Sequence, residues 1–119
     1  MPKQKLSEKE IQKWILDYLL ANRIGFFWRN NTVGVYDPTR KCYRKNKSQV
    51  NGIPDILGIL YGQFVAIECK KQGRKVLDEN QKIFKDKFEL NEGHYYLAND
   101  IDDFVSWIRE LEYILKNEI

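Results

Sequence analysis

The sequence contains few residues that could bind zinc or form disulfides. Its 119 residues include one histidine, His94, and two cysteines, Cys42 and Cys69. The cysteines have no CxxC spacing, and one histidine cannot complete a Cys/His zinc site. These shortages argue against a zinc-binding module and against a disulfide-rich secreted domain. We therefore expect a reduced protein of the cytoplasm.

Long hydrophobic runs are also missing. No stretch approaches the roughly 20 apolar residues of a membrane-spanning helix, and the first residues, MPKQKLSEKE, lack the apolar core of a signal peptide. We therefore expect no membrane partner and no export. The excess of one charge is small as well, because 20 Lys and Arg against 17 Asp and Glu give a net charge of +3. Total charge alone does not identify a nucleic-acid-binding protein.

The residues that are present suit a single α/β domain covering residues 1–119. Hydrophobic residues make up 43% of the chain and aromatic residues 13%, which is enough for one core, whereas the chain is too short for two ordinary domains. Hydrophobic periodicity, capping patterns and turn residues predict the order α-β-β-β-α-β-α, with a mixed central sheet flanked by helices. The expected helices run from Ser7 to about Gly25, from Asp78 to about Gly93 and over the tail from about Asp102, and the expected strands are 26–30, 94–98 and the two that flank Tyr61–Gly62.

Residues 31–52 do not fit a regular element. Glycine, proline and asparagine interrupt the segment, and Asp37 is its only acid. The pattern predicts either a long basic loop or a ragged hairpin. Its cations are Arg40, Lys41, Arg44, Lys45 and Lys47.

The two strands around Tyr61–Gly62 bring charged residues together. A two-residue turn there, counted back along both strands, places Asp55 opposite Glu68. Opposed side chains have Cβ atoms roughly 4.5–5.5 Å apart, and like charges in that arrangement destabilise a sheet. Because side chains alternate along a strand, Lys70 shares the face of Glu68. A three-residue turn would instead shift the pairing by one residue and break this opposition.

A divalent cation would remove the repulsion between the two acids. Two carboxylates at this separation suit Mg²⁺ or Mn²⁺, which bind hard oxygen ligands and leave positions for water and a substrate phosphate. Such an ion lowers the pKa of a bound water and shields charge that develops on a phosphodiester. Lys70 could orient that water or neutralise the transition state. The residues themselves therefore predict metal-dependent phosphodiester hydrolysis.

Several short motifs give the sequence a resemblance to a nuclease family. GIPD at 52–55 and ECK at 68–70 resemble the PD-(D/E)XK nuclease signature. Together with SEKEIQ, FFWRNNT and Gln81, they are similar to the virus-type replication-repair nuclease (VRR-NUC) domain of that superfamily. The resemblance covers nearly the whole chain and implies a restriction-endonuclease-like core. Small stand-alone forms occur in phages, so a phage-encoded protein would act in the host-cell cytoplasm.

The resemblance implies a role for each residue of the signature. Asp55 and Glu68 would be metal ligands, the backbone carbonyl of Cys69 a further ligand, and Lys70 the catalytic lysine. The cofactor would be Mg²⁺ or Mn²⁺. The structural alternative for Glu68 and Lys70 is a solvated ion pair on an edge strand.

Two further residues have both a catalytic and a structural interpretation. The family pattern makes Glu10 the acid of the first helix that reaches the metal, and makes Gln81 a catalytic glutamine of the next helix. Each also lies three residues after a capping residue, Ser7 or Asp78. A capping box could therefore account for either side chain without a metal.

The cations favour a nucleic-acid substrate. Arg29 follows the aromatic strand beside the predicted site, and the other expected DNA contacts lie in the basic segment and just after the catalytic strand. The full set of expected DNA-contact residues is Arg29, Arg44, Lys45, Lys47, Lys71, Arg74 and Lys75. The alternative for any one of them is an ordinary solvated lysine or arginine.

Three hypotheses follow from these patterns. The first is an Mg²⁺- or Mn²⁺-dependent DNA endonuclease that resolves branched DNA such as Holliday junctions. The second is a nuclease that nicks, or that cuts flaps or linear duplex. The third is a DNA-binding protein on a nuclease fold that does not cut. Symmetric cutting of a junction needs two active sites, so the first hypothesis also predicts a homodimer.

Overall fold

The secondary structure is known for most of the chain. The computed structural model describes residues 4–30, 35–44 and 50–118, with the backbone alone at 35–36 and 43–44. The helices are α1 (Glu8–Ala21), α2 (Glu79–Leu90) and α3 (Ile101–Asn117). The strands are β1 (Phe26–Arg29), β2 (Val35–Asp37), β3 (Cys42–Arg44), β4 (Ile56–Leu60), β5 (Gln63–Cys69) and β6 (His94–Ala98).

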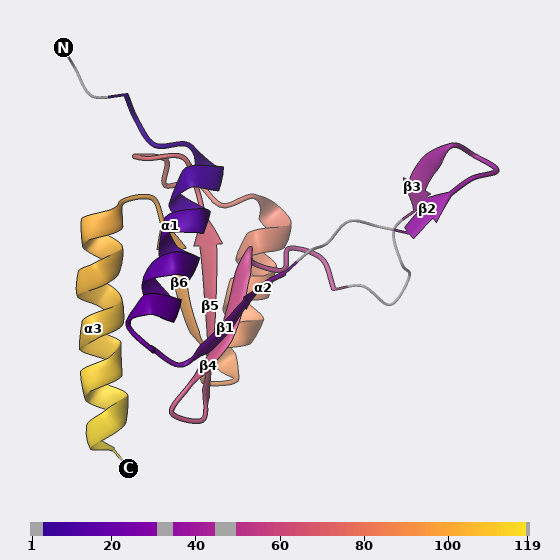
Figure 1. The fold of residues 1–119 in the computed structure, drawn as a ribbon. Coiled ribbons are helices and arrows are strands. Elements are labelled where there is room, and N and C mark those ends of the chain that lie inside the picture. The colour runs from indigo at the N-terminus through magenta and orange to yellow at the C-terminus, as the bar shows by residue number, and fades with distance from the viewer. Residues whose placement is uncertain (1–3, 31–34, 45–49, 119) are drawn as a thin grey trace.

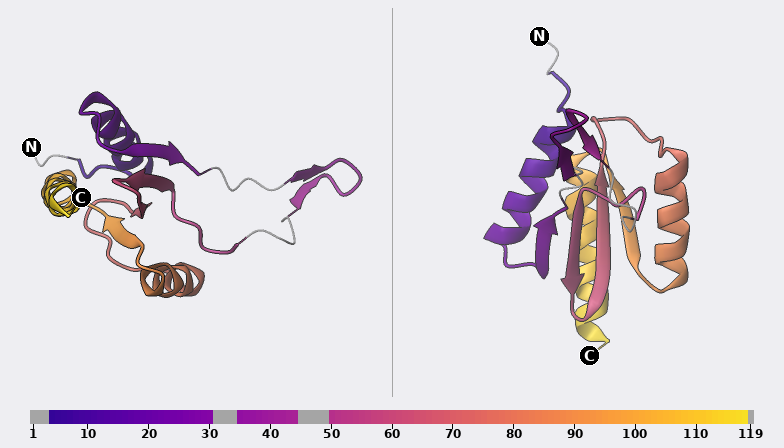
Figure 2. Two further views of the ribbon diagram at one scale, coloured as in Figure 1. Left: turned by 90° about the horizontal axis from the view of Figure 1, so that it is seen from below. Right: turned by 90° about the vertical axis from the view of Figure 1, so that its right-hand side faces the viewer.

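Four of these strands form a mixed sheet in the order β1-β4-β5-β6. β4 is antiparallel to β1 and to β5, whereas β6 is parallel to β5. Figures 1 and 2 show α1 and α3 on one face of the sheet and α2 on the other, beside β6. The described chain is therefore an α/β domain with helices on both faces of a mixed sheet, as the sequence predicts.

β2 and β3 form a separate two-stranded antiparallel sheet. Figure 1 shows this hairpin standing away from the four-stranded sheet. Residues 35–44, within the predicted segment 31–52, form the hairpin, which was one of the two alternatives. The predicted order lacked these two strands; without them the elements follow as α1, β1, β4, β5, α2, β6 and α3.

α1 is four residues shorter than predicted at its C-terminus. Ser7 caps its start with the expected capping box, but the helix ends at Ala21 instead of near Gly25. The last turn closes because Arg23 adopts a positive φ of 53° and the Ile24 amide donates to the Leu19 carbonyl at 3.0 Å. This is the Schellman arrangement, in which glycine is usual at the position that Arg23 occupies. Sequence patterns therefore placed the end too late.

A tight turn sets the register of β4 and β5. Tyr61 and Gly62 both have positive φ, 48° and 82°, as the type I′ turn of a two-residue hairpin requires. This turn pairs Leu60 with Gln63. The register predicted from the sequence is confirmed, and the one-residue shift does not occur.

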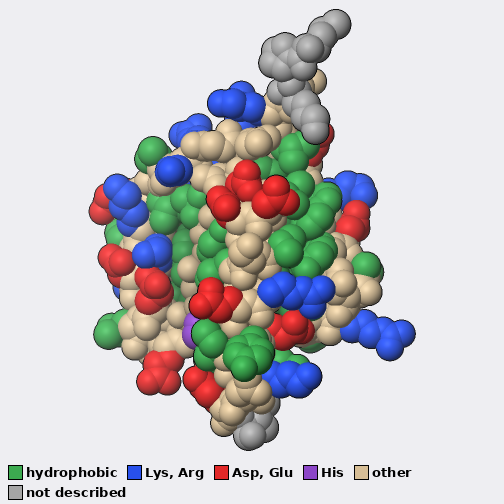
Figure 3. All heavy atoms as spheres, turned by 90° about the vertical axis from the view of Figure 1, so that its left-hand side faces the viewer, with side chains coloured by type: hydrophobic (Ala, Val, Ile, Leu, Met, Phe, Trp, Pro, Cys, Tyr) green, Lys and Arg blue, Asp and Glu red, His purple; other side chains and the backbone are tan. Residues whose placement is uncertain are grey.

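The buried core lies between the sheet and the pair α1 and α3. Ile11 and Ile15 of α1 and Phe104 and Ile108 of α3 are each 0% exposed, and they recur at the predicted helical spacing. No helix among the described residues is long and apolar enough to cross a membrane. Figure 3 views the side that carries α3, where side chains of both charge signs mix with hydrophobic ones. That mixture is typical of a solvated surface.

Candidate metal and catalytic site

Glu68 is a buried acid at the end of a central strand. It is 3% exposed, and β5 lies between β4 and β6. Glu68 is buried because the first turn of α2 covers its side of β5. From that turn, Gln81 Nε2 donates to Glu68 Oε1 at 3.0 Å. The structure therefore excludes a solvated ion pair on an edge strand for this residue.

Asp55 is held beside Glu68 by backbone hydrogen bonds. The Cys69 amide donates to Asp55 Oδ2 at 2.9 Å, and the Asn30 amide donates to the Asp55 carbonyl at 2.8 Å. These bonds tie the residue to β5 on one side and to the end of β1 on the other. One carboxylate oxygen is thereby fixed, and the other can serve as a metal ligand. The Cys69 carbonyl as a further ligand stays a prediction.

A third carboxylate joins the two predicted acids. Glu8, Asp55 and Glu68 each offer one carboxylate oxygen, and these atoms all lie within 4.8 Å of one another. Glu8 is the first residue of α1 and precedes the buried Ile11 and Ile15 by three and seven residues. That spacing puts Glu8 on the helix face that packs against the sheet. Sequence analysis missed Glu8, although its place on the buried stripe could have identified it.

Glu10, the acid predicted from the first helix, is not part of this cluster of described residues. Its Oε1 accepts a hydrogen bond from the Ser7 amide at 3.0 Å, and the Glu10 amide donates to Ser7 Oγ at 3.2 Å. The hydrogen bond from the Ser7 backbone lowers the pKa of Glu10. Two residues correspond to about 200° around a helix, so Glu10 points away from the sheet when Glu8 faces it. Glu8 thus takes the position expected of Glu10.

Lys70 and Gln81 complete a connected network with Glu68. Lys70 Nζ donates to Gln81 Oε1 at 3.0 Å and lies 3.9 Å from Glu68 Oε1. Gln81 Oε1 also accepts from the Asp78 amide at 2.9 Å, which forms the capping box of α2. The catalytic and the capping interpretations of Gln81 are therefore compatible, because one side chain makes both sets of contacts.

The acids are poorly compensated without a cation. Burial, followed by the neighbouring Asp55 carboxylate, raises the pKa of Glu68 from 4.5 to about 8, although Lys70 acts in the opposite direction. Burial and the same acids also raise the pKa of the Cys69 thiol, and the side chain is 0% exposed, so the environment disfavours its thiolate. A divalent cation among the three carboxylates would offset both repulsion and lost hydration.

Two buried polar groups in this region were not predicted. Tyr95 is 8% exposed, and within the described residues neither its hydroxyl nor the Asn30 Nδ2 has a hydrogen-bond partner. Burial raises the pKa of Tyr95, and Glu68 and Asp55 add to the rise. The hydroxyl therefore lies in the field of the acid cluster. No sequence pattern could have identified this hydroxyl, because Tyr95 looks like any other core aromatic residue of its strand.

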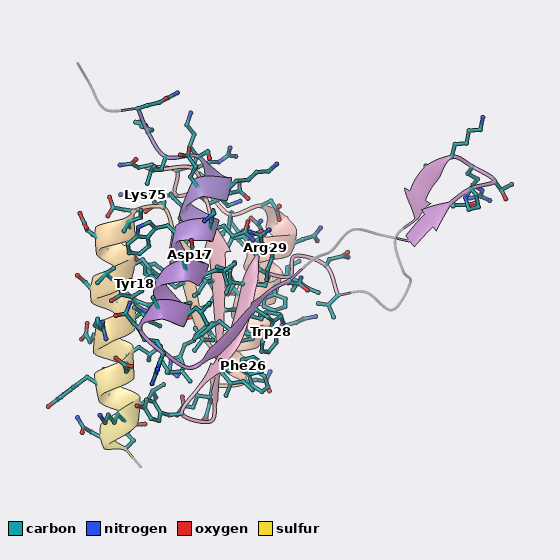
Figure 4. All side chains as sticks on the ribbon, viewed as in Figure 1. Asp17, Tyr18, Phe26, Trp28, Arg29 and Lys75 are labelled. Atoms are coloured by element: carbon teal, nitrogen blue, oxygen red, sulfur yellow. The ribbon has the colours of Figure 1, made fainter. Side chains whose placement is uncertain are left out.

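Five of the predicted DNA-contact cations lie in three parts of the described chain. Arg29 is exposed at the end of β1, next to the Asn30 that contacts Asp55. The exposed cations on the loop after β5 are Lys71, Arg74 and Lys75. Figure 4 labels Arg29 and Lys75. Arg44 belongs to β3, whereas Lys45 and Lys47 lie outside the described residues.

The two acids of α1 can be separated by substitution. We expect Glu8→Gln to weaken Mn²⁺ binding at least about tenfold, because one of three charged ligands is lost. Glu10→Gln is the matched control, since glutamine also serves in a capping box and Glu10 is outside the cluster. Calorimetric titration of the metal-free protein with Mn²⁺ measures both. Equal affinities for the two variants would remove Glu8 from the site.

Comparisons with protein-family models, with curated proteins and with solved structures find no match to this chain. The functional interpretation therefore depends on the geometry of the site itself. That geometry is three carboxylates around one point, with a lysine and a glutamine bonded into the same network.

Proposed function

We propose that the protein is a metal-dependent DNA endonuclease of the VRR-NUC type, with a PD-(D/E)XK core. The observation that carries the proposal is the group of three carboxylate oxygens within 4.8 Å of one another. Beside this group, Lys70 Nζ lies 3.9 Å from Glu68 Oε1. Carboxylates that can hold a divalent cation, with a lysine beside them, suit metal-dependent hydrolysis of a phosphodiester.

The residues present fit Mg²⁺ or Mn²⁺. All three side chains offer hard oxygen donors, and the structure gives Glu68 no full counter-charge, since its pKa is raised in spite of Lys70. Glu8, Asp55 and Glu68 would hold the ion, with the Cys69 carbonyl as a further ligand. When bound, the ion would supply Lewis acidity and a more acidic water.

The chain's own residues would divide the remaining work. The Cys69 amide fixes one oxygen of Asp55, so the other carboxylate oxygen keeps a constant position. Lys70 is 12% exposed at its side chain and would neutralise the negative charge that builds on the phosphate oxygens. Gln81 orients Lys70 and Glu68 by bonding to both. Arg29 would contact a neighbouring phosphate.

Branched DNA is the proposed substrate, and a homodimer the proposed assembly. Exposed cations follow Lys70 on the loop after β5, and Arg29 ends β1 next to Asn30. In this proposal they would hold the backbone of DNA on either side of a cut. Two symmetric cuts across a junction require two such sites, which a C2 dimer supplies.

The test is a cleavage assay on labelled four-way junction, flap and linear duplex with Mg²⁺, Mn²⁺ or EDTA. Paired cuts in the junction that need a metal would support a resolving nuclease. Cuts confined to flap or duplex would support a nuclease of the second kind. DNA binding without cutting under any metal would leave a non-catalytic DNA-binding protein.

A further inference from the structure

An aromatic groove runs along α2 on the same side of the sheet as Glu68. Its volume is about 460 Å³, within the range of ligand pockets. Phe64 of β5 and Ile83 of α2 line it while 59% and 44% exposed. Phe84 and Phe88 stack with ring centroids 5.4 Å apart. Gly93 makes room for these rings, because a Cβ there would lie 2.2 Å from the Phe88 ring.

The polar lining of the groove is neutral or positive. It consists of three amide side chains, Asn51, Asn80 and Asn91, and one cation, Lys87. No carboxylate is among the described residues that line it, although the chain contains 17 acids. Amides can donate to and accept from base edges, and a lysine can contact a phosphate. The groove therefore combines flat apolar surfaces with groups that complement a nucleotide.

The groove leads toward the acid cluster. Phe64 and Glu68 lie four residues apart in β5, so their side chains share a face of the sheet about 13 Å apart. At the other wall, Asn80 immediately precedes Gln81, whose amide contacts Glu68. At about 3.4 Å per stacked nucleotide, a strand in the groove would be within about four nucleotides of the cluster.

We propose that this groove binds unpaired bases of the DNA substrate, and this inference rests on the proposed nuclease function. The bases would stack on the exposed Phe64 ring and on the Phe84 and Phe88 pair, which tolerate any base because every base has an aromatic face. The asparagine amides would meet the base edges, and Lys87 the backbone. Among branched DNA substrates, the enzyme would thereby favour those with an unpaired segment next to the cut.

A second copy of the chain is a poorer fit to the same surface. An apolar interface between copies would remove water from Asn51, Asn80, Asn91 and Lys87, and each would then need a polar partner on the other copy. Nucleobases bring such partners on their own edges.

The test uses flap DNA with 2-aminopurine among its first unpaired bases, in EDTA so that nothing is cut. We expect binding to change the fluorescence, and Phe64→Ala to weaken binding about 5- to 150-fold, as loss of one stacked base implies. Affinity for fully paired duplex should stay unchanged. Tyr113→Ala is the matched control, because Tyr113 is an aromatic residue of α3, 70% exposed and on the other side of the sheet.

Three results would overturn the groove proposal. Phe64→Ala could leave flap affinity unchanged, or could weaken flap and duplex affinity equally. It could also convert a dimer into a monomer in sedimentation, which would show that the surface is an interface between two copies of the chain. Cleavage of four-way junction, flap and duplex with Mn²⁺ is measured separately. If flap binding depends on Phe64 but no DNA is cut, the nuclease proposal is wrong and the groove still binds unpaired bases. If DNA is cut but flap binding does not depend on Phe64, the nuclease proposal stands and the groove proposal is wrong.

Discussion

Replacing Lys70 with alanine is expected to reduce DNA cleavage by about 10²- to 10⁴-fold while DNA binding in EDTA stays within a few-fold of the wild type. The ammonium lies 3.9 Å from Glu68 Oε1 and is held by Gln81, so its charge is fixed where a phosphodiester would meet the acids. Its loss removes transition-state stabilisation and leaves the outer DNA-binding surface intact. Single-turnover rates with labelled junction, flap and duplex measure the effect.

Lys71→Ala is the matched control for this prediction. Lys71 is the next residue along the chain, is exposed, and contributes the same charge to the overall field. We expect its loss to weaken binding modestly and to leave the single-turnover rate within a few-fold of the wild type. Similar losses of rate in both variants would show that the lysines act through general attraction for DNA and would contradict a catalytic Lys70. Thermal melts of each variant exclude unfolding as the cause.

Local sequence patterns predicted the parts of the site that local geometry determines. The glycine turn at Tyr61–Gly62 set the hairpin register, and the register set Asp55 beside Glu68. The pattern from Asp78 to Gln81 predicted the cap of α2. The Gln81 side chain that completes this cap also contacts Lys70 and Glu68. Such features need only a few neighbouring residues, so one sequence is enough to find them.

The choice of acid in the first helix depended on tertiary packing. Glu8 and Glu10 both belong to the first turn of α1, and a capping motif made Glu10 the more conspicuous of the two. Which acid faces the sheet is decided by the buried stripe of Ile11 and Ile15, and hence by how α1 lies on β5. The alternation of side chains predicted which face of β5 carries Glu68, but its burial depends on the placement of α2, which alternation does not give.

Raising the pH is expected to destabilise the metal-free protein between about pH 5 and pH 8. Glu68 has a pKa of about 8 in the folded protein, against 4.5 for the ordinary group. Between these values the folded state keeps a proton that the unfolded state has released. The free energy of unfolding therefore falls as pH rises through this window, and the loss is complete above the folded pKa. For a residue 3% exposed the total is on the order of a few kcal/mol.

Mn²⁺ should reverse this trend, because metal ligands must be deprotonated and the ion binds only the folded site. Melting temperatures measured across the window with EDTA and with Mn²⁺ should diverge as the pH rises. Glu68→Gln should abolish both the metal-free decline and the metal-induced rise, since it removes the titrating carboxylate and a ligand together. His94→Gln controls for the single histidine of the chain, the side-chain type that ordinarily titrates in this range.

These melting temperatures show whether the acid cluster binds a metal ion. A decline in EDTA that Mn²⁺ reverses, and that Glu68→Gln removes, would show that the fold accepts destabilised carboxylates in order to bind a cation. A decline that Mn²⁺ leaves unchanged would show buried acids without a metal function, and the nuclease proposal would then lose its cofactor. Melting temperatures that are flat in EDTA would contradict a raised Glu68 pKa, because an acid that ionises equally in the folded and unfolded states contributes no pH dependence to stability.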